Sequence, residues 1–150
     1  MGEVRVKVLL TNVADAHALA EGKLPAEKVR QLAAEALVDA GAVRSCVPAP
    51  LLERLGLPPY KLQLVEYVDG RKDPVGVADG IRFEILGRTS SDDALVVGDE
   101  VLVGQTLLEK MDLLVDCATH QLVPNPAHPD VAVNKLKRAV ASSREVHYAL

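Results

Sequence analysis

One aspartate stands where a carboxylate has chemistry open to it. The apolar residues 36–38 lead directly into Asp39, and the residues 40–42 that follow are Ala, Gly and Ala. None of these side chains is large enough to cover the carboxylate. Because burying an ionised carboxylate without a partner is costly, Asp39 is either a surface turn residue or a group with a chemical task. An apolar run before Asp and Gly is also a common strand-to-turn signal, so the spacing alone leaves both interpretations open.

The residues after this turn favour the second interpretation. Pro50 precedes the mixed apolar and charged run 51–55, and Gly56 closes that run. This pattern predicts a short helix with Pro50 at its first position and Gly56 as its left-handed cap. The unit is therefore a strand, a tight turn at Asp39, a second extended segment and a short helix.

That unit resembles the catalytic loop of the retropepsin-like aspartic peptidases, the single-domain relatives of pepsin. Their loop reads hydrophobic-hydrophobic-Asp-Thr/Ser-Gly-Ala, and Asp39, Gly41 and Ala42 match it. Ala40 stands where the family has Thr or Ser. The resemblance implies that Asp39 is catalytic and that residues 40–42 form the active-site loop, with no cofactor and no metal.

Aspartic peptidase chemistry needs two carboxylates about 3 Å apart that share one proton. One carboxylate activates a water molecule, and the other hydrogen-bonds or protonates the carbonyl of the scissile bond. This chain has one Asp-x-Gly turn of the required kind, so the resemblance implies a homodimer in which each copy gives Asp39 to a two-fold axis. The expected substrate is an extended peptide or unfolded protein.

Ala40 bears directly on this expectation. In the family, the hydroxyl at this position hydrogen-bonds across the dimer axis, and a hydrogen bond contributes roughly 0.5 to 1.5 kcal/mol. Three interpretations follow: a weakly active peptidase, an inactive homologue that only binds peptides, or an engineered change at an otherwise ordinary site. The competing functional class is therefore a non-catalytic homodimeric module that takes an extended peptide by strand addition.

An Asp-Gly dipeptide between two extended segments predicts a hairpin after the Asp39 loop. Its arms read YKLQLVEYV before Asp69-Gly70 and PVGVADGIRFEILG after residue 73. By the resemblance, this hairpin is the flap that closes over the substrate, although an ordinary surface hairpin has the same pattern. The expected flap residues are Tyr67, Val68, Asp69, Gly70 and Arg71. A second dipeptide, Asp79-Gly80, is an alternative tip.

The remaining pattern favours strands. Alternation predicts a strand from residue 4 to about residue 12 that pairs with residues 29–38, across a loop or brief helical turn at 13–27. Residues 88–94 read as a polar loop, and 95–97 with 101–103 read as a further hairpin. Val103-Gly104 resembles the second-repeat loop that precedes the C-terminal helix of the family.

The segment after Gly104 carries a helix signal and a second aspartate. Thr106 and Glu109 form a capping-box pattern, with an apolar face on the helix that follows. Asp116 ends the expected strand 113–115 and echoes the Asp39 sequence, which raises the possibility of a second catalytic aspartate. Because no glycine follows Asp116 to open the turn, we interpret it as a hairpin-turn residue.

The predicted architecture is mainly β, a retropepsin-like closed β-barrel or sandwich with a flap hairpin and one or two short helices. Of the 150 residues, 1–126 are predicted to form the peptidase-like domain. Residues 127–150 are predicted to be a C-terminal tail, with helical spacing of apolar residues between 133 and 140. Val, Leu and Ala must build the core, because aromatic residues make up only 3% of the chain.

Composition argues against several other classes. The net charge of −4 disfavours nucleic acid and acidic membrane surfaces as partners. The start of the chain has no signal-peptide pattern, so we expect a cytoplasmic protein, and Cys46 and Cys117 are then expected to be free thiols. The four histidines lack the spacing of metal ligands; they are His17, His120, His128 and His147.

Overall fold

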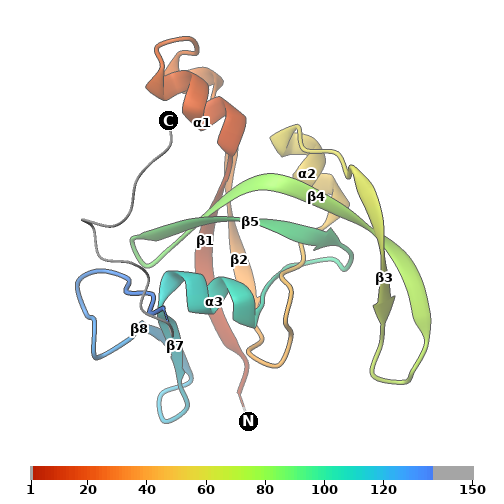
Figure 1. Cartoon of the computed structure of the whole chain (residues 1–150), viewed down its shortest axis with the longest axis vertical. Coiled ribbons are helices and arrows are strands. Elements are labelled where there is room, and N and C mark those ends of the chain that lie inside the picture. Colours follow the sequence, from red (N-terminus) through yellow and green to blue (C-terminus); the bar gives the residue numbers. More distant parts are fainter. Residues whose placement is uncertain (1, 137–150) are drawn as a thin grey trace, which may run out of the picture.

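The first two strands form the centre of the molecule. In the computed structural model, which describes residues 2–136, β1 (Val4–Asn12) and β2 (Gln31–Val38) pair antiparallel along their full length. Their alternating apolar residues bury Val8 of β1 and Ala36 of β2, as the period-two pattern requires. The predicted hairpin is confirmed, and its two strands stand side by side in Figure 1.

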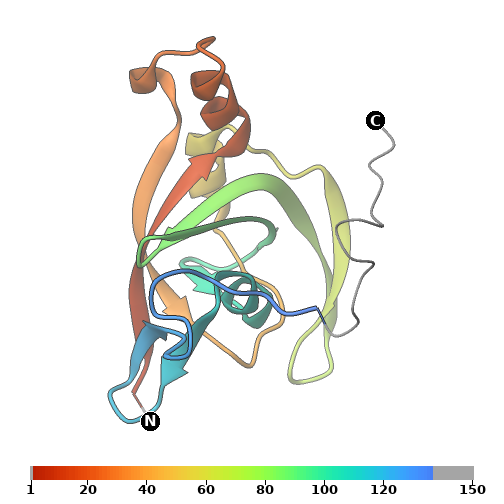
Figure 2. The same cartoon turned by 60° about the vertical axis from the view of Figure 1, so that its left-hand side comes forward.

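The connection between β1 and β2 contains more helix than the sequence predicted. Helix α1 (Val13–Ala20) and a short 3-10 turn, η1 (Ala26–Lys28), occupy the expected loop. The side chain of Asn12 accepts a hydrogen bond from the Asp15 N–H and so caps α1. Both elements lie at the end of the molecule opposite the N-terminus (Figure 2).

Four further strands extend the central pair into one six-stranded sheet. They run in the order β3-β4-β1-β2-β6, and β5 pairs with the other side of β4. All of these pairs are antiparallel except β2 with β6. The added strands are β3 (Lys61–Glu66), β4 (Lys72–Ile85), β5 (Arg88–Val96) and β6 (Val101–Val103).

The mainly β prediction is confirmed, but the predicted closed barrel is wrong for the strands that the structure describes. The six-stranded sheet is open between β5 and β6. Only the short segment around Cys46 spans that opening, through single-residue bridges to Leu95 and Leu102. A separate two-stranded sheet is formed by β7 (Leu113–Asp116) and β8 (Gln121–Pro124).

The predicted polar loop at residues 88–94 is wrong, because these residues form most of β5. The turn that joins β4 to β5 consists of Leu86 and Gly87, both with positive φ, and pairs Ile85 with Arg88. Two such residues make the tight turn that suits a hairpin. Thr89 and Ser91 of β5 are exposed, whereas Arg88 at its start and Ala94 near its end are buried.

The predicted hairpin between residues 95–97 and 101–103 is also wrong. Residues 45–47 lie between these two segments and take the hydrogen bonds that a hairpin would have used. Leu95 donates to the Ser45 carbonyl and accepts from the Val47 N–H, and Leu102 exchanges two bonds with Cys46. As a result, β6 runs parallel to β2, and the Asp39 loop passes around it.

Among the described residues there are three short α-helices, one more than the upper expectation. Helix α2 (Ala49–Leu55) ends at Gly56, whose φ of 69° makes it the predicted left-handed cap. Helix α3 (Gln105–Met111) buries Leu107 on its predicted apolar face. The capping box is wrong, because α3 begins after Gly104 without a side-chain cap.

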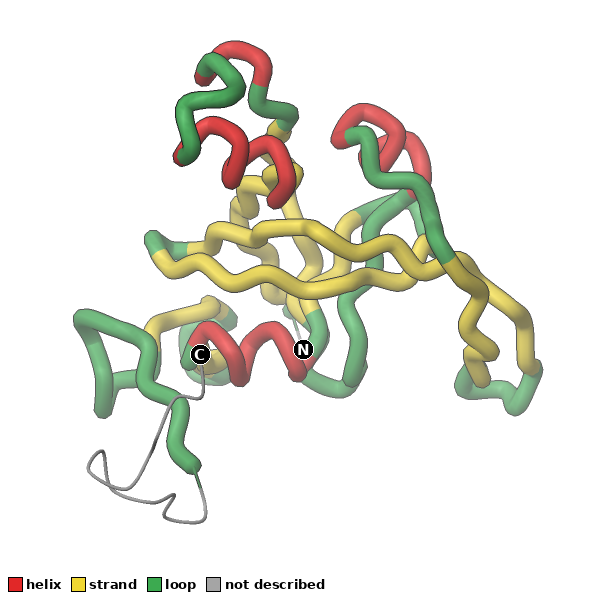
Figure 3. The backbone as a smooth tube through the Cα atoms, turned by 45° about the horizontal axis from the view of Figure 1, so that its top comes forward, coloured by secondary structure: helices red, strands yellow, loops and turns green. Residues whose placement is uncertain are grey.

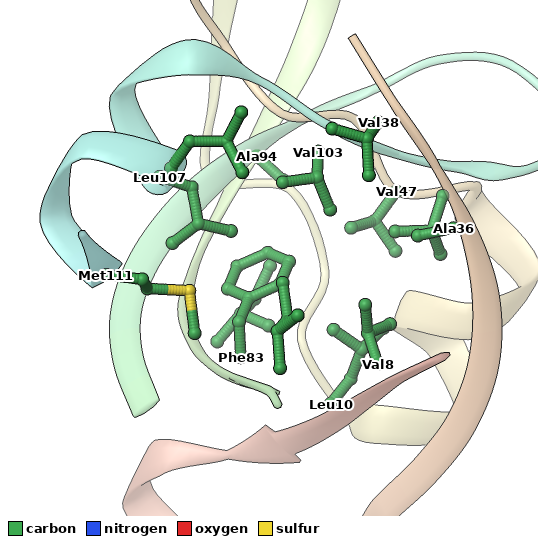
Figure 4. Close-up of a cluster of buried hydrophobic side chains, with 14 of the residues drawn as sticks. Val8, Leu10, Ala36, Val38, Val47, Phe83, Ala94, Val103, Leu107 and Met111 are labelled. Carbon is green, nitrogen blue, oxygen red and sulfur yellow. The ribbon is translucent and has the colours of Figure 1, made fainter. Parts of the chain in front are cut away.

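The core lies between the curved sheet and the helix α3. Phe83, the single phenylalanine of the chain, is fully buried at its centre. Figure 4 shows its ring among side chains from β1, β2 and α3. These include Val8, Leu10, Ala36, Val38, Leu107 and Met111. Aliphatic residues therefore supply nearly all of the buried apolar surface, which drives folding.

Residues 125–136 form an irregular segment beside α3. Residues 132–136 have no helical structure, and the rest of the predicted tail helix lies outside the described residues. Within residues 2–136, no helix is long and apolar enough to cross a membrane.

Candidate active site

Asp39 sits in a tight turn directly after β2. The Gly41 N–H donates to Asp39 Oδ1 at 2.9 Å, and the Ala42 N–H donates to the Asp39 carbonyl at 3.1 Å. Asp39, Ala40 and Gly41 are all exposed. Among the described residues, no hydrogen bond reaches the second carboxylate oxygen, Oδ2. The turn therefore presents a carboxylate with one free oxygen to the outside of the single chain.

Backbone hydrogen bonds fix this turn to the start of α3. Asp39 donates its N–H to the Val103 carbonyl at 2.9 Å, while Gln105 and Thr106 donate to the carbonyls of residues 42 and 43 at 2.7 and 3.1 Å. The first N–H groups of a helix have no partners within the helix. The loop supplies acceptors for two of them, which explains why α3 needs no side-chain cap.

Gly104 lies in close contact with the same loop. A Cβ atom at this position would lie 2.6 Å from the carbonyl oxygen of Arg44 and 3.0 Å from that of Ala42. The Gly104 N–H donates to the hydroxyl of Ser45 at 3.0 Å. The structure thus brings Val103-Gly104 and the Asp39 loop together.

The β3–β4 hairpin extends away from the rest of the sheet (Figure 3). At its tip, Asp69 accepts a hydrogen bond from the Arg71 N–H, and Gly70 has a φ of 86°. The Arg71 guanidinium lies 4.6 Å from the centre of the Tyr67 ring, a cation–π contact that spans the turn. Val68 is fully exposed at the end.

The alternative tip, Asp79-Gly80, is part of β4 rather than a turn between strands. It lies at the irregularity between Ala78 and Ile81, where the register with β5 shifts. Gly80 has a φ of 75°, which suits a bulge. The hairpin tip is therefore Asp69-Gly70.

A cleft of about 380 Å³ separates the loop after Asp39 from the hairpin. Its walls include Val43 from the loop, Val65 from β3 and Leu102 from β6. Arg44 also lines it and is paired with Asp93 of β5 at 2.9 Å. The cleft is thus mainly apolar with a charged pair beside it, and one of its walls continues directly into the Asp39 turn.

Two thiols and a second aspartate are the other side chains near this region that could take part in chemistry. Burial raises the pKa of the Cys46 thiol, so this group in the cleft is kept neutral, and Cys117 is an exposed free thiol. Asp116 accepts a hydrogen bond from the Ala118 N–H at 3.0 Å, which is the geometry of a turn residue. Among the described residues, no three His, Cys, Asp or Glu side chains gather as metal ligands would.

Sequence reasoning missed two features of this region. The buried hydroxyl of Ser45 was not singled out, because a serine after an Asp-x-Gly turn has many ordinary uses. The pair of Arg44 with Asp93 joins residues 49 positions apart, and Asp93 lay in the segment interpreted as a loop. The one available signal for Ser45 was its position as a small polar residue directly before the apolar residues 46 and 47.

Comparisons with known proteins add a similarity of structure but none of sequence. No family model matches the chain, and no curated protein matches its sequence. Among solved structures, the chain is similar to the protease of simian foamy virus (mac), determined in solution. The two share 19% sequence identity, and the match covers 69% of this chain and 90% of that one with a TM-score of 0.44. A similarity at this level assigns neither residues nor an activity to this chain.

Proposed function

We propose that the chain is an aspartic endopeptidase of the retropepsin-like type, active as a homodimer with Asp39 of both copies at the two-fold axis. One observation carries the proposal. Asp39 is exposed with a free carboxylate oxygen, yet its turn is held by backbone hydrogen bonds beside an apolar cleft. The turns at Asp69 and Asp116 also leave one carboxylate oxygen open. The Asp39 turn differs from them because its backbone is bonded to residues 103–106 and it lies next to the cleft.

A single Asp39 is not sufficient for the reaction. Two carboxylates that face each other closely cannot both be ionised, because like charges at this distance repel strongly. They share one proton, so that the ionised carboxylate accepts a proton from the attacking water while the protonated one donates to the scissile carbonyl. The pair titrates as a unit, and its two apparent pKa values belong to both copies together.

The cleft and the hairpin are suited to an extended peptide. The walls of the cleft offer apolar side chains, and β3 is an edge strand whose outer backbone groups have no strand partner among the described residues. A peptide laid between the Asp39 turn and the hairpin would pair with backbone groups and place side chains in the cleft. In this proposal Tyr67 to Arg71 are the flap.

The sequence position that carries the most weight against catalysis is Ala40. Without a hydroxyl there, the cross-axis hydrogen bonds are lost, so a second candidate function is a homodimer that binds peptides and does not cleave them. We propose residues 1–126 as the functional domain in either case. Cytoplasmic localisation remains a prediction from the start of the chain, and the absence of nucleic-acid partners remains a prediction from the net charge.

The two candidates differ in a direct test. An unfolded protein substrate is incubated with the chain between about pH 4 and pH 7, where a shared-proton carboxylate pair is expected to work, over a range of chain concentrations. The peptidase gives new amino termini at a rate that rises with the square of chain concentration while monomers prevail. The binding module retains the substrate intact, and a chain that stays monomeric at all concentrations contradicts both.

A further inference from the structure

We infer that Ser45 is a positioning residue for the Asp39 carboxylate. Its hydroxyl ties the Asp39 loop to the Gly104 segment within each chain, and so holds the loop in place where Ala40 provides no hydroxyl. The inference rests on the proposed function in one respect, the catalytic role of the Asp39 carboxylate. Its structural basis is independent of any activity.

The hydroxyl is placed where it has no access to water. Ser45 is 2% exposed, and its Oγ accepts the Gly104 N–H at 3.0 Å. Gly104 is buried as well. A buried N–H that loses its acceptor pays the full cost of desolvation, whereas a satisfied one contributes modestly. The bond therefore matters most through what its loss would do to Gly104.

Among the described residues, one hydrogen bond between the Asp39 loop and residues 103–106 involves a side chain, and it is the bond from the Gly104 N–H to the Ser45 hydroxyl. The others join backbone groups, at Asp39 with Val103 and at Gln105 and Thr106 with the loop carbonyls. Backbone bonds form with almost any sequence, so they do not distinguish this serine from other residues. The position of Gly104 relative to the loop is thus the part of the contact that depends on residue type.

The path from Ser45 to the carboxylate is short. Gly104 follows Val103, and the Val103 carbonyl accepts the N–H of Asp39 at 2.9 Å. The contact is also tight, because the Arg44 carbonyl lies within 2.6 Å of where a Cβ of Gly104 would be. If the Ser45 bond is lost, Gly104 can gain a new acceptor only by moving, and that movement carries Val103 and hence Asp39.

The same contact explains how the loop tolerates alanine at position 40. A loop held only across a dimer axis would be loose in the single chain. Here the turn is fixed before any partner arrives, so each copy presents its carboxylate already oriented. Preorganisation of this kind lowers the cost of assembling a catalytic pair.

The test compares Ser45→Ala with Ser45→Thr, which keeps the hydroxyl, and with Ser91→Ala as a control at an exposed serine of β5. Amide hydrogen exchange of Gly104, Asp39 and the core residue Phe83 is measured by NMR. Loss of the acceptor is expected to speed exchange at Gly104 and Asp39 roughly tenfold and to leave Phe83 unchanged. Ser91→Ala should match the parent chain. Ser45→Thr keeps the acceptor but adds a methyl group at a buried site, so its exchange at Gly104 and Asp39 should stay slower than that of Ser45→Ala.

Equal acceleration at all three amides would show a merely structural residue, and no acceleration would show no role at all; either result overturns the inference. If Ser45→Ala does not fold, Ser45→Cys fills the site with a somewhat larger side chain that is a much weaker acceptor, and it is judged by the same three amides. Where cleavage is measurable, kcat should fall roughly tenfold with KM unchanged. If no chain cleaves any substrate, the peptidase proposal fails, and the exchange data still decide whether Ser45 positions Asp39.

Discussion

Asp39 and Asp112 both end a regular element, but their carboxylates are treated in opposite ways. Asp39 accepts one hydrogen bond, from the N–H of its own turn. Asp112 accepts three, from the Asn125 amide, the Val133 N–H and the His128 ring. These partners, the Asn125 amide foremost, hold the pKa of the Asp112 carboxyl at about 2, below its ordinary value of 3.8.

The residues around the two carboxylates differ in the same way. Arg88 is buried beside Asp112 and donates to the carbonyls of Met111, Asp112 and His128, so that residues 125–133 are tied across the end of α3. At Asp39 only the backbone is tied down. The Asp112 carboxylate is thus satisfied by its own chain, whereas one oxygen of the Asp39 carboxylate is left open. Four substitutions test how these two aspartates and the Asp39 loop behave.

The largest effect is expected from Asp39→Asn. The amide keeps the shape of the side chain but cannot share a proton, and acid–base catalysis of this kind contributes about 10² to 10⁴ in rate. Peptide cleavage should fall by at least that factor while the circular dichroism spectrum and melting temperature stay close to those of the parent chain. Asp116→Asn, at a turn residue, should cleave normally; loss of cleavage there instead would exchange the roles of the two aspartates.

Gly104→Ala should destabilise the chain by about 1 to 3 kcal/mol, the usual cost of overpacking. The new methyl group would lie 2.6 Å from the Arg44 carbonyl oxygen. That oxygen has little freedom to move, because the carbonyls of Val43 and Ser45 on either side of it accept hydrogen bonds. Gly2→Ala is the matched control, because its Cβ would meet His120 at an ordinary 3.7 Å. Urea unfolding of both variants measures the difference. Equal stability would mean that the Asp39 loop is not held as tightly as its hydrogen bonds indicate.

Ala40→Thr should strengthen the dimer by roughly 1 to 3 kcal/mol, from two symmetric hydrogen bonds. Ala40 is exposed in the single chain, so its own loop leaves room for the larger side chain. Sedimentation equilibrium of the parent, Ala40→Thr and Ala40→Ser gives the dissociation constants. If both variants form weaker dimers, the interface has repacked around alanine, and the binding module becomes the better proposal.

The smallest change is expected from Asp112→Asn, and it depends on pH. Because the folded-state pKa of Asp112 is depressed, its stabilisation is complete above pH 3.8 and is lost as the pH falls through about 2. The Asn variant should be less stable than the parent near neutral pH and should lose less stability across that acid window. Urea midpoints measured on either side of the window report this. If the stabilities of the parent and the variant change equally with pH, the ionised Asp112 carboxylate does not stabilise the fold through these hydrogen bonds.

Local signals in the sequence predicted the elements that depend on neighbours in the chain. The β1–β2 hairpin follows from alternation, α2 from Pro50 and Gly56, and the hairpin tip from Asp69-Gly70. In each case the residues that cause the structure lie within it or directly beside it. The position of Asp39 at the end of a strand is of the same kind.

The remaining features depend on residues far apart in the sequence. Residues 45–47 enter between β5 and β6, and nothing within 95–103 indicates this. The start of β5 was missed because Leu86 adopts a φ of 52° in its turn, a conformation that leucine rarely takes. Likewise Ser45 meets Gly104, and Asp112 meets Asn125 and Val133, only after the chain has folded.

We expect two copies of the chain to bring their Asp39 carboxylates together, and a crystal structure of the parent chain measures this directly. We expect a symmetric dimer in which carboxylate oxygens of the two Asp39 side chains lie about 3 Å apart on the two-fold axis. Ser45 and Gly104 should stay hydrogen-bonded in each copy. A solution monomer whose crystal contacts leave both Asp39 side chains apart in solvent would contradict the claim.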